Sequence, residues 1–404
     1  MAGGLMQLVA YGAQDVYLTG NPKVTFFQAV YKKHTNFAME NIEQTVNGTA
    51  AKDGRVSVTI ARNGDLVGEM YLELTPALTA TGQDMPYLAE RAVKDIELTI
   101  GGQRIDKHYQ RWWRLYSELY LDEAKKVNWG KMTSKPNATS TGKVFLPLIF
   151  FFNRNPGLFL PLIALQYHEV RLDIDLSSQY DLFTGSLKVW ANYVFLDTEE
   201  RRRFAQKGHE YLIEQVQHTG SDSTGTAGSE KQIRLSYNHP VKELVWCLTK
   251  GDVDKSNLWN LSTASATADF GAADVAPHHA GAPLLATPTP ADFSEDVAGR
   301  LDNFKLVLNG QDRFKEQGGK YFNQVQPFCH HSGVPATGVY SYSFALKPEE
   351  HQPTGTCNFS RIDNAQVAVK SRTGGIEATT QEMFAVNYNV LRIQSGMGGL
   401  AFSN

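Results

Sequence analysis

The segment IELTIGGQ, from Ile96 to Gln103, recurs later in the chain as FKLVLNGQ, from Phe304 to Gln311. Each copy carries a two-residue turn signal, Gly-Gly in the first and Asn-Gly in the second. Such dipeptides are favoured where a chain reverses direction, because glycine and asparagine tolerate a positive φ. The repeat therefore predicts that one strand-and-turn unit occurs twice in the same chain.

Two further matches, later in each half, share a single spacing. Val170 to Leu176 corresponds to the segment that begins at Ala365, and Asn192-Tyr193 corresponds to Asn387-Tyr388. This spacing is shorter than that of the first match, and an extra loop expected at 128–143 in the first half accounts for the difference. A repeat this long is a whole domain rather than a solenoid unit, so we predict tandem copies of one β domain that meet near 206–210.

Period-two alternation of apolar residues recurs in short runs along the chain. The runs are Val56, Val58 and Ile60; Leu172, Ile174 and Leu176; Tyr340, Tyr342 and Phe344; and Val367 with Val369. This period is typical of half-buried strands, and the turn signals between the runs are spaced as in a sandwich or barrel. The predicted fold class is mostly β.

Three segments depart from this pattern. Aromatic residues fall at helical spacing from Tyr109 to Lys126, which predicts one amphipathic helix whose aromatic stripe packs on its own domain. The segment Gly251–Gly299 is rich in Ala, Thr, Ser, Asp and Pro and predicts a long surface loop, with a shorter one at Asn128–Lys143.

The composition of the chain excludes some classes of function. With 42% hydrophobic and 20% charged residues the chain can bury a large core, and its net charge of −3 offers no excess of cations for nucleic acid. The three cysteines lack metal-ligand spacing, which fits a reducing compartment. We expect no transmembrane helix, because the longest apolar run, Val144–Phe152, is too short, and no export signal at the start.

Several long strings identify a family. They are LTGNPKVTFFQAVYKKHTNF (18–37), RNGDL (62–66), IGGQRIDKHY (100–109), LPLIFFFNRNPGLFLPLIALQYHEVRL (146–172), LNGQDRF (308–314), YSFALKPEEHQPTGTCNFSRIDNA (342–365) and NYNVLRIQSGMGGLAFSN (387–404). Together they resemble the double jelly-roll major capsid proteins of nucleocytoplasmic large DNA viruses, especially those of algal viruses such as chloroviruses. The resemblance covers almost the whole chain.

The resemblance implies two consecutive eight-stranded antiparallel jelly rolls, with domains at 23–207 and 208–404 after an N-terminal segment at 1–22. It further implies a structural protein of the virion that is made and assembled in the host cytoplasm. Its partners would be two further copies in a pseudo-hexagonal homotrimer, neighbouring capsomers, minor capsid proteins and an internal viral membrane that the inner face approaches. The icosahedral shell would enclose double-stranded DNA that this chain does not bind directly. For 1–22 the resemblance implies the inner base of the capsomer; packing on the first domain is the alternative.

Four Asn-x-Ser/Thr triplets are candidate glycosylation sites, at Asn47, Asn137, Asn260 and Asn358. Asn137 and Asn260 lie in predicted loops, which favours them over Asn358 in a strand-like region. Triplets of this kind also arise by chance, and virus-encoded glycosylation in the resembling family need not follow the motif.

No residue set predicts catalysis, a cofactor or a metal site. In each of the pairs His278-His279 and His330-His331, adjacent strand residues would point to opposite faces, so each pair could offer only one metal ligand to a given face. Asp173 and Asp175 share one face of a strand, and we interpret this face as an ordinary solvent-exposed one. The final SGMGGL lacks the context of a phosphate loop. A cupin-type enzyme is disfavoured because no HxH pattern accompanies the His-Glu neighbours, and a lectin is a weaker alternative because the long loop offers few aromatic residues.

Overall fold

The repeated strand-and-turn unit forms two equivalent hairpins in the computed structural model. Strand β5 (Val93–Ile100) turns through Gly101 and Gly102 into β6 (Gln103–Tyr109), and β14 (Leu301–Leu308) turns through Asn309 and Gly310 into β15 (Gln311–Asp312). All four turn residues have a positive φ, between 50° and 83°, as a type I′ turn requires. The duplication predicted from the sequence is therefore confirmed at this hairpin.

The described residues are 3–77, 87–134, 142–249, 299–333, 335, 338–373 and 378–402. By its internal contacts the chain divides into two units, residues 1–36 and residues 37–404. The first contains helices α1 (Gly3–Val9) and α2 (Val16–Thr19), neither of which buries a residue. Among the described residues, no helix combines the length and hydropathy needed to cross a membrane. The expected loop at 251–299 lies almost entirely outside the described residues.

The second unit contains four antiparallel sheets. Sheet one has the order β1 (Phe37–Gln44), β10 (Phe183–Leu196), β4 (Leu66–Pro76), β7 (Val144–Pro147), and β8 (Leu160–Pro161) also pairs with β4. Sheet two has the order β2 (Val46–Asn47), β3 (Arg55–Thr59), β9 (Val170–Leu176), β5, β6. Sheet three has the order β11 (His209–Ser223), β20 (Thr380–Gln394), β13 (Pro240–Thr249), β17 (Val339–Ser343), with β18 (Cys357–Asn358) on β13 and β21 (Met397–Leu400) on β20. Sheet four has the order β12 (Glu230–Leu235), β19 (Ala365–Ser371), β14, β15, with β16 (Gln317–Gly318) on β14.

Sheets one and two form one sandwich, called roll 1 below, and sheets three and four form a second, called roll 2. The strand order β1-β10-β4-β7 of sheet one is repeated as β11-β20-β13-β17 in sheet three, and β3-β9-β5-β6 of sheet two is repeated as β12-β19-β14-β15 in sheet four. Eight strands thus correspond one to one in the order of the chain. This is the two-sheet, eight-stranded topology of a jelly roll, present twice.

Alternation explains why these segments are strands. In β3 the side chains of Val56 and Val58 are buried and face the sandwich interior, while their neighbours are more exposed. In roll 2, Trp246, Phe304 and Tyr340 fill the interior, with the rings of Trp246 and Phe304 stacked at 4.4 Å. The strands predicted from period-two alternation are confirmed, and the fold is mostly β.

The predicted single helix from Tyr109 to Lys126 is wrong in one respect, because two helices occupy this region. Helix α4 (Gln110–Leu119) ends before Asp122, whose side chain accepts a hydrogen bond from the backbone N–H of Lys125 at 2.7 Å and caps α5 (Glu123–Thr133). A capping aspartate favours a new helix start over continuation of the old one. The loop predicted at 128–143 begins later than expected, because α5 continues to Thr133. Trp129 of α5 is buried and donates a hydrogen bond to Glu90.

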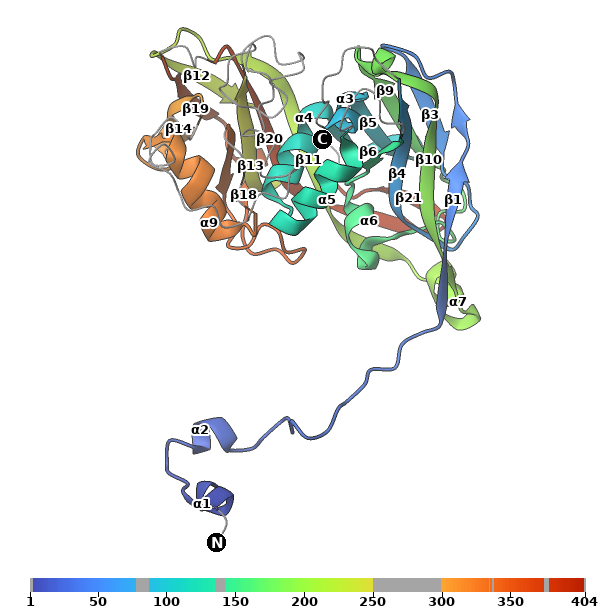
Figure 1. Ribbon diagram of the computed structural model, residues 1–404, viewed down its shortest axis with the longest axis vertical. Coiled ribbons are helices and arrows are strands. Elements are labelled where there is room, and N and C mark those ends of the chain that lie inside the picture. The colour runs from blue at the N-terminus through green and yellow to red at the C-terminus, as the bar shows by residue number, and fades with distance from the viewer. Residues whose placement is uncertain are drawn as a thin grey trace. The chain divides into compact units, whose positions relative to one another are not determined.

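Shorter helices complete the described fold. They are α3 (Leu88–Arg91), α6 (Phe151–Arg154), α7 (Thr198–Gln206) and α9 (Gln326–His330), the 3₁₀ turns η1 (Pro156–Leu158), η2 (Tyr180–Leu182) and η6 (Phe359–Arg361), and the π-helical turn η5 (Tyr321–Val325). Helix α7 lies in the chain between the last strand of roll 1 and the first strand of roll 2. Figure 1 shows α4 and α5 between the two rolls, where they can contact both.

Candidate assembly site: the junction between the rolls

Helix α4 carries the aromatic stripe, and its two faces pack on different rolls. Trp113 is fully buried on roll 1 and donates from Nε1 to the carbonyl oxygen of Pro147 at 3.1 Å. Trp112, which is 3% exposed, packs instead on Phe384 of roll 2, with ring centroids 5.7 Å apart. The expectation that the stripe packs on its own domain is confirmed for Trp113 and is incomplete for Trp112, which also meets roll 2. Consecutive residues of a helix point in different directions, and here each direction meets a sheet.

The apolar core of roll 1 continues across α4 onto the outer face of sheet three. Val245, Cys247, Phe384 and Val386 are all buried and belong to the same contiguous apolar cluster as the interior of roll 1. Both faces of β13 and β20 are consequently buried, one inside roll 2 and the other at the junction. Burial of this kind makes the two rolls one packed body.

Hydrogen bonds join the adjacent strands β6 and β11 at the same junction. The Asp106 carboxylate accepts from the backbone N–H of Val216 at 3.0 Å, and the Gln215 side-chain amide donates to the carbonyl oxygen of Ile105. The Gln215 amide oxygen accepts in turn from Asn389 on β20 at 3.0 Å. The junction removes these polar groups from water. Leaving them without hydrogen-bond partners would lower the stability of the fold, and the bonds described here avoid that loss.

A buried ion cluster lies where α6 meets sheet three. The Glu214 carboxylate on β11 receives Arg154 of α6 at 2.9 Å and Lys242 of β13 at 2.5 Å. Lys242, whose side chain is 1% exposed, also donates to the carbonyl oxygen of Pro348 at 2.6 Å. Burial alone would raise the pKa of Glu214, but the two cations outweigh it and hold that pKa below its ordinary value. The cluster therefore links the rolls through a carboxylate that stays ionised.

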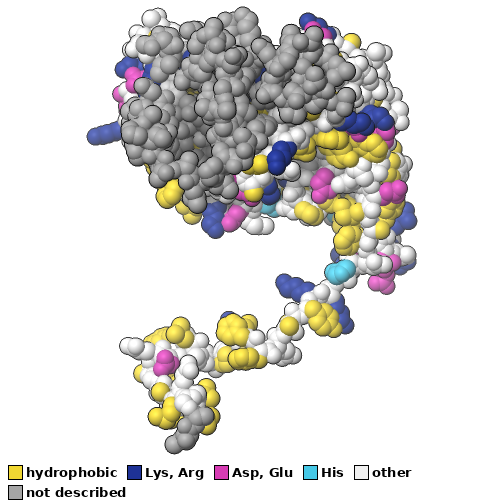
Figure 2. Space-filling model, viewed as in Figure 1, with side chains coloured by type: hydrophobic (Ala, Val, Ile, Leu, Met, Phe, Trp, Pro, Cys, Tyr) yellow, Lys and Arg dark blue, Asp and Glu magenta, His cyan; other side chains and the backbone are white. Residues whose placement is uncertain are grey.

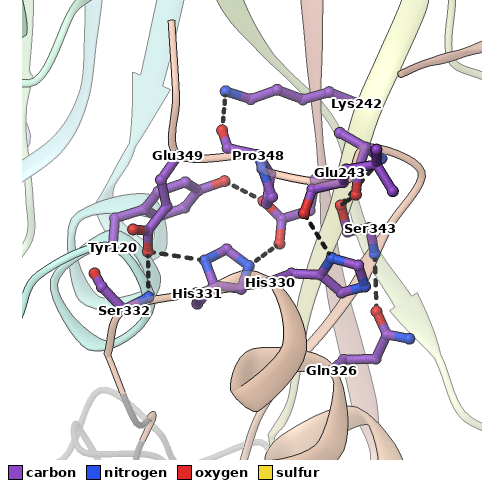
Figure 3. A network of polar contacts seen from close by, with 12 residues as sticks. Tyr120, Lys242, Glu243, Gln326, His330, His331, Ser332, Ser343, Pro348 and Glu349 are labelled. Atoms are coloured by element: carbon purple, nitrogen blue, oxygen red, sulfur yellow. Dashed lines mark hydrogen bonds and ion pairs between the residues drawn. The ribbon is translucent and has the colours of Figure 1, made fainter. Parts of the chain in front are cut away.

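A second buried polar network centres on His331 (Figure 3). The His331 Nε2 lies 2.5 Å from a Glu243 oxygen, and its Nδ1 lies 3.2 Å from Glu349. The other Glu243 oxygen accepts from the Tyr120 hydroxyl at 2.5 Å, so this network also reaches roll 1. Burial would lower the pKa of His331, but Glu243 and Glu349 outweigh it and raise the pKa to about 9. We infer that His331 is a cation held between two carboxylates at neutral pH.

The free energy of unfolding is expected to fall as the pH rises from 6.5 towards 9. The pKa of His331 is raised from 6.5 to about 9 in the folded chain, so the folded state binds the proton more tightly than the unfolded state. The resulting stabilisation is complete below pH 6.5 and is lost as the pH passes through 9, with a size on the order of 3 kcal/mol. Urea unfolding at a series of pH values measures it. A His331→Gln variant with the same pH dependence as the unmodified chain would rule out this assignment.

The structure describes two of the four candidate glycosylation sites. Asn47 on β2 and Asn358 on β18 are exposed, while Asn137 and Asn260 lie outside the described residues. The Asn358 side-chain oxygen accepts from the backbone N–H of Ser360 at 3.0 Å, so this side chain already has a local partner. In the part of the chain that the structure describes, no group of three or more His, Cys, Asp or Glu side chains is arranged to hold a metal ion.

The aspartates of β9 do not form the plain solvent face that the sequence predicts. The Asp173 side chain is only 10% exposed and lies 2.6 Å from Arg171 of the same strand. Asp175 pairs with Arg55 of the neighbouring β3 at 3.3 Å. The long arginine side chains cover the carboxylates, which period-two alternation alone does not reveal.

The first unit, residues 1–36, exposes an unusual amount of apolar surface. Phe26 and Phe27 are 93% and 99% exposed. Figure 2 shows apolar side chains along much of this unit and Lys side chains close to its end. The cations there are Lys32 and Lys33. An apolar surface of this extent is typical of a segment that is covered in an assembly.

The fold and the junction together define the class: a double jelly-roll protein whose two rolls are packed into one body. Comparison with known protein families gives the same class. Residues 25–197 match the family described as "Major capsid protein N-terminus", and residues 200–399 match "Large eukaryotic DNA virus major capsid protein". The chain therefore belongs to the family of major capsid proteins of large eukaryotic DNA viruses, a family of structural shell proteins and not of enzymes.

Individual relatives support the same assignment. The chain is 46% identical to the major capsid protein of Paramecium bursaria Chlorella virus 1 and 42% identical to that of Pyramimonas orientalis virus, with all of each chain covered. A solved chain from the capsid of the Chlorella virus matches with a TM-score of 0.80 and 40% identity over 94% of this chain and 100% of that one. The Faustovirus major capsid protein shares the fold with a TM-score of 0.72 at 12% identity, covering 97% and 96% of the two chains.

Proposed function

We propose that the chain forms homotrimeric, pseudo-hexagonal capsomers of an icosahedral shell around double-stranded DNA. The observation that carries this proposal is the duplication: two rolls with the same strand order are fixed side by side in one body. Three such bodies around a threefold axis present six similar wedges, which approximates sixfold symmetry and tiles a flat facet. Electron microscopy of the purified protein tests it. Hexagonal particles are expected, and particles without six-part outlines contradict the proposal.

The proposed division of the chain is an N-terminal segment at 1–22, a first domain at 23–207 and a second at 208–404. The matches to the two family descriptions, at 25–197 and 200–399, support a boundary in this region. The segment 1–22 lies at the capsomer base in this proposal, where its exposed apolar residues meet minor capsid proteins and the internal membrane. Assembly takes place in the host cytoplasm, and the net charge of −3 supports a shell that does not bind the DNA directly.

Deletion of residues 2–22 is expected to leave folding intact and to impair shell assembly. No described residue of this segment is buried, so the free energy of unfolding of the remainder should change by less than about 0.5 kcal/mol. Urea unfolding measures the first effect, and incorporation of the truncated chain into particles in infected cells measures the second. Normal incorporation would contradict the proposed place of the segment.

Asn47 is our first choice among the candidate glycosylation sites that the structure describes. Its side chain is exposed, and it has no side-chain hydrogen bond to the described residues. Asn358 is a weaker candidate on account of its bond to Ser360. Asn137 and Asn260 remain proposals from the sequence. Mass spectrometry of peptides from virions is expected to find a glycan at Asn47 more often than at Asn358. The reverse ranking would contradict this reading.

A further inference from the structure

Strand β21 belongs to a sheet of one roll and lies against the other roll. It pairs with the end of β20 in sheet three, with Ile393 opposite Gly398 and Leu391 opposite Leu400. Leu391 and Ile393 are buried in the apolar cluster that fills roll 1, and β21 lies against β6 of that roll (Figure 1). The hairpin of β20 and β21 therefore carries sheet three across the junction. Residues 396–402 are called the β21 strap below.

Three residues of roll 1 hold the strap by hydrogen bonds. The backbone N–H of Tyr167 donates to the carbonyl oxygen of Gly396 at 3.0 Å, and the Gln103 side-chain oxygen accepts from a backbone N–H of the strap at 3.2 Å. The His168 Nδ1 lies 2.9 Å from the carbonyl oxygen of Gly398 and 3.1 Å from its backbone nitrogen. This nitrogen donates to the oxygen when it carries a proton and accepts from the N–H when it does not, so His168 binds the strap in either state.

The glycine-rich run SGMGGL allows the strap to approach roll 1 this closely. Ser395 and Gly396 form the turn between β20 and β21, with φ values of 53° and 81°. A Cβ on Gly398 would lie 2.7 Å from the Leu165 side chain and 3.2 Å from that of Ile100, so a larger residue would force the strap and roll 1 apart. Close packing at the junction therefore explains this run.

The two equivalent hairpins differ at the position that faces His168. The first turn carries Gly101 at a φ of 58°, and the second carries Asn309 at a φ of 50°. Asparagine tolerates a positive φ, so backbone conformation alone does not require glycine in the first turn. A Cβ on Gly101 would collide with the His168 ring, whereas the Asn309 side chain accepts from the backbone N–H of Asn364 at 3.0 Å. The space taken by His168 explains the difference between the two copies.

We propose that the β21 strap fastens the two rolls to each other, with His168 as the positioning residue that holds it and Gly101 as the residue that leaves room for His168. The strap joins sheet three to the β5–β6 hairpin of roll 1, so it restricts rotation of one roll against the other. It acts within a single chain, and the proposal therefore does not rest on the trimeric capsomer.

Hydrogen exchange of the full chain, followed by mass spectrometry of peptides that contain the strap, tests the proposal. Gly101→Asn is expected to speed exchange of the strap amides about tenfold, because the new side chain displaces His168. The matched control is Gly102→Asn in the same turn. Gly102 also has a positive φ, of 83°, and no described residue lies within 4 Å of where its Cβ would be. This control should stay within about twofold of the unmodified chain.

A double-variant cycle separates release of the strap from damage to the hairpin. His168→Ala alone should speed strap exchange as much as Gly101→Asn does, and the two changes together should add little, because the displaced ring is already absent. Equal exchange in Gly101→Asn and Gly102→Asn would overturn the proposal. An unchanged rate in His168→Ala, or a Gly101→Asn effect that persists in full without the histidine ring, would do so too. A chain that is monomeric in light scattering would overturn the capsomer proposal alone, since exchange reports on the single chain.

Discussion

Replacement of Glu214 with alanine is expected to lower the free energy of unfolding by about 3–5 kcal/mol. Glu214 is the only anion that the described residues place within ion-pair distance of Lys242, and it also receives Arg154 at 2.9 Å. Without the carboxylate, the Lys242 ammonium stays buried with only the carbonyl oxygen of Pro348 as a hydrogen-bond acceptor. An uncompensated buried charge costs far more than the intact pair contributes. Urea unfolding followed by circular dichroism measures the loss.

The double variant Glu214→Ala, Lys242→Met separates charge burial from simple loss of packing. Methionine retains much of the lysine stem without the charge, so the double variant should regain part of the stability that Glu214→Ala loses. Equal stability of the single and double variants would contradict the argument. A loss of stability below about 1 kcal/mol in Glu214→Ala would also contradict it, because solvent-exposed ion pairs contribute no more than that.

Truncation of Trp112 to alanine is expected to cost about 3–5 kcal/mol, the usual range for a buried tryptophan. Trp112 lies between the rolls, with its ring 5.7 Å from Phe384 of roll 2 and 6.1 Å from Tyr120. The cavity would open at the junction rather than inside either sandwich. We therefore expect the rolls to unfold less cooperatively, with transitions by circular dichroism and by total tryptophan fluorescence that no longer coincide.

Tyr167→Ala serves as the matched control for this truncation. Tyr167 is 75% exposed, and its loss should change stability by less than about 0.5 kcal/mol. If Trp112→Ala and Tyr167→Ala destabilise the chain to the same small extent, the junction is not a packed interface. A single cooperative transition in Trp112→Ala would show that the remaining contacts suffice to couple the rolls.

Much of the fold could be predicted because its determinants are local. The turn residues Gly101-Gly102 and Asn309-Gly310 need a positive φ, and Gly and Asn are the residues that tolerate it, so both turns are visible in the sequence. Alternation such as Val56 and Val58 likewise reflects one buried sheet face. The duplication was visible because the two copies retain the same residues at the same turn.

The junction could not be predicted because its determinants are far apart in the chain. Glu214 and Lys242 meet Arg154 from another roll, and no spacing rule links them. His331 was recognised only as half of a histidine pair without metal-ligand geometry, and the carboxylates that surround it come from distant strands and loops. Sheets buried on both faces, such as sheet three, also lose the alternation that guides strand assignment.

The most direct test of the central claim is the solution mass of the purified chain, measured by light scattering coupled to size exclusion over a wide dilution range. A capsomer building block should have three times the mass of the chain and should keep it on dilution, because the exposed apolar surfaces are covered only in the trimer. A stable monomer at every concentration would contradict the claim. It would leave a chain that needs an assembly partner or a lectin-like module.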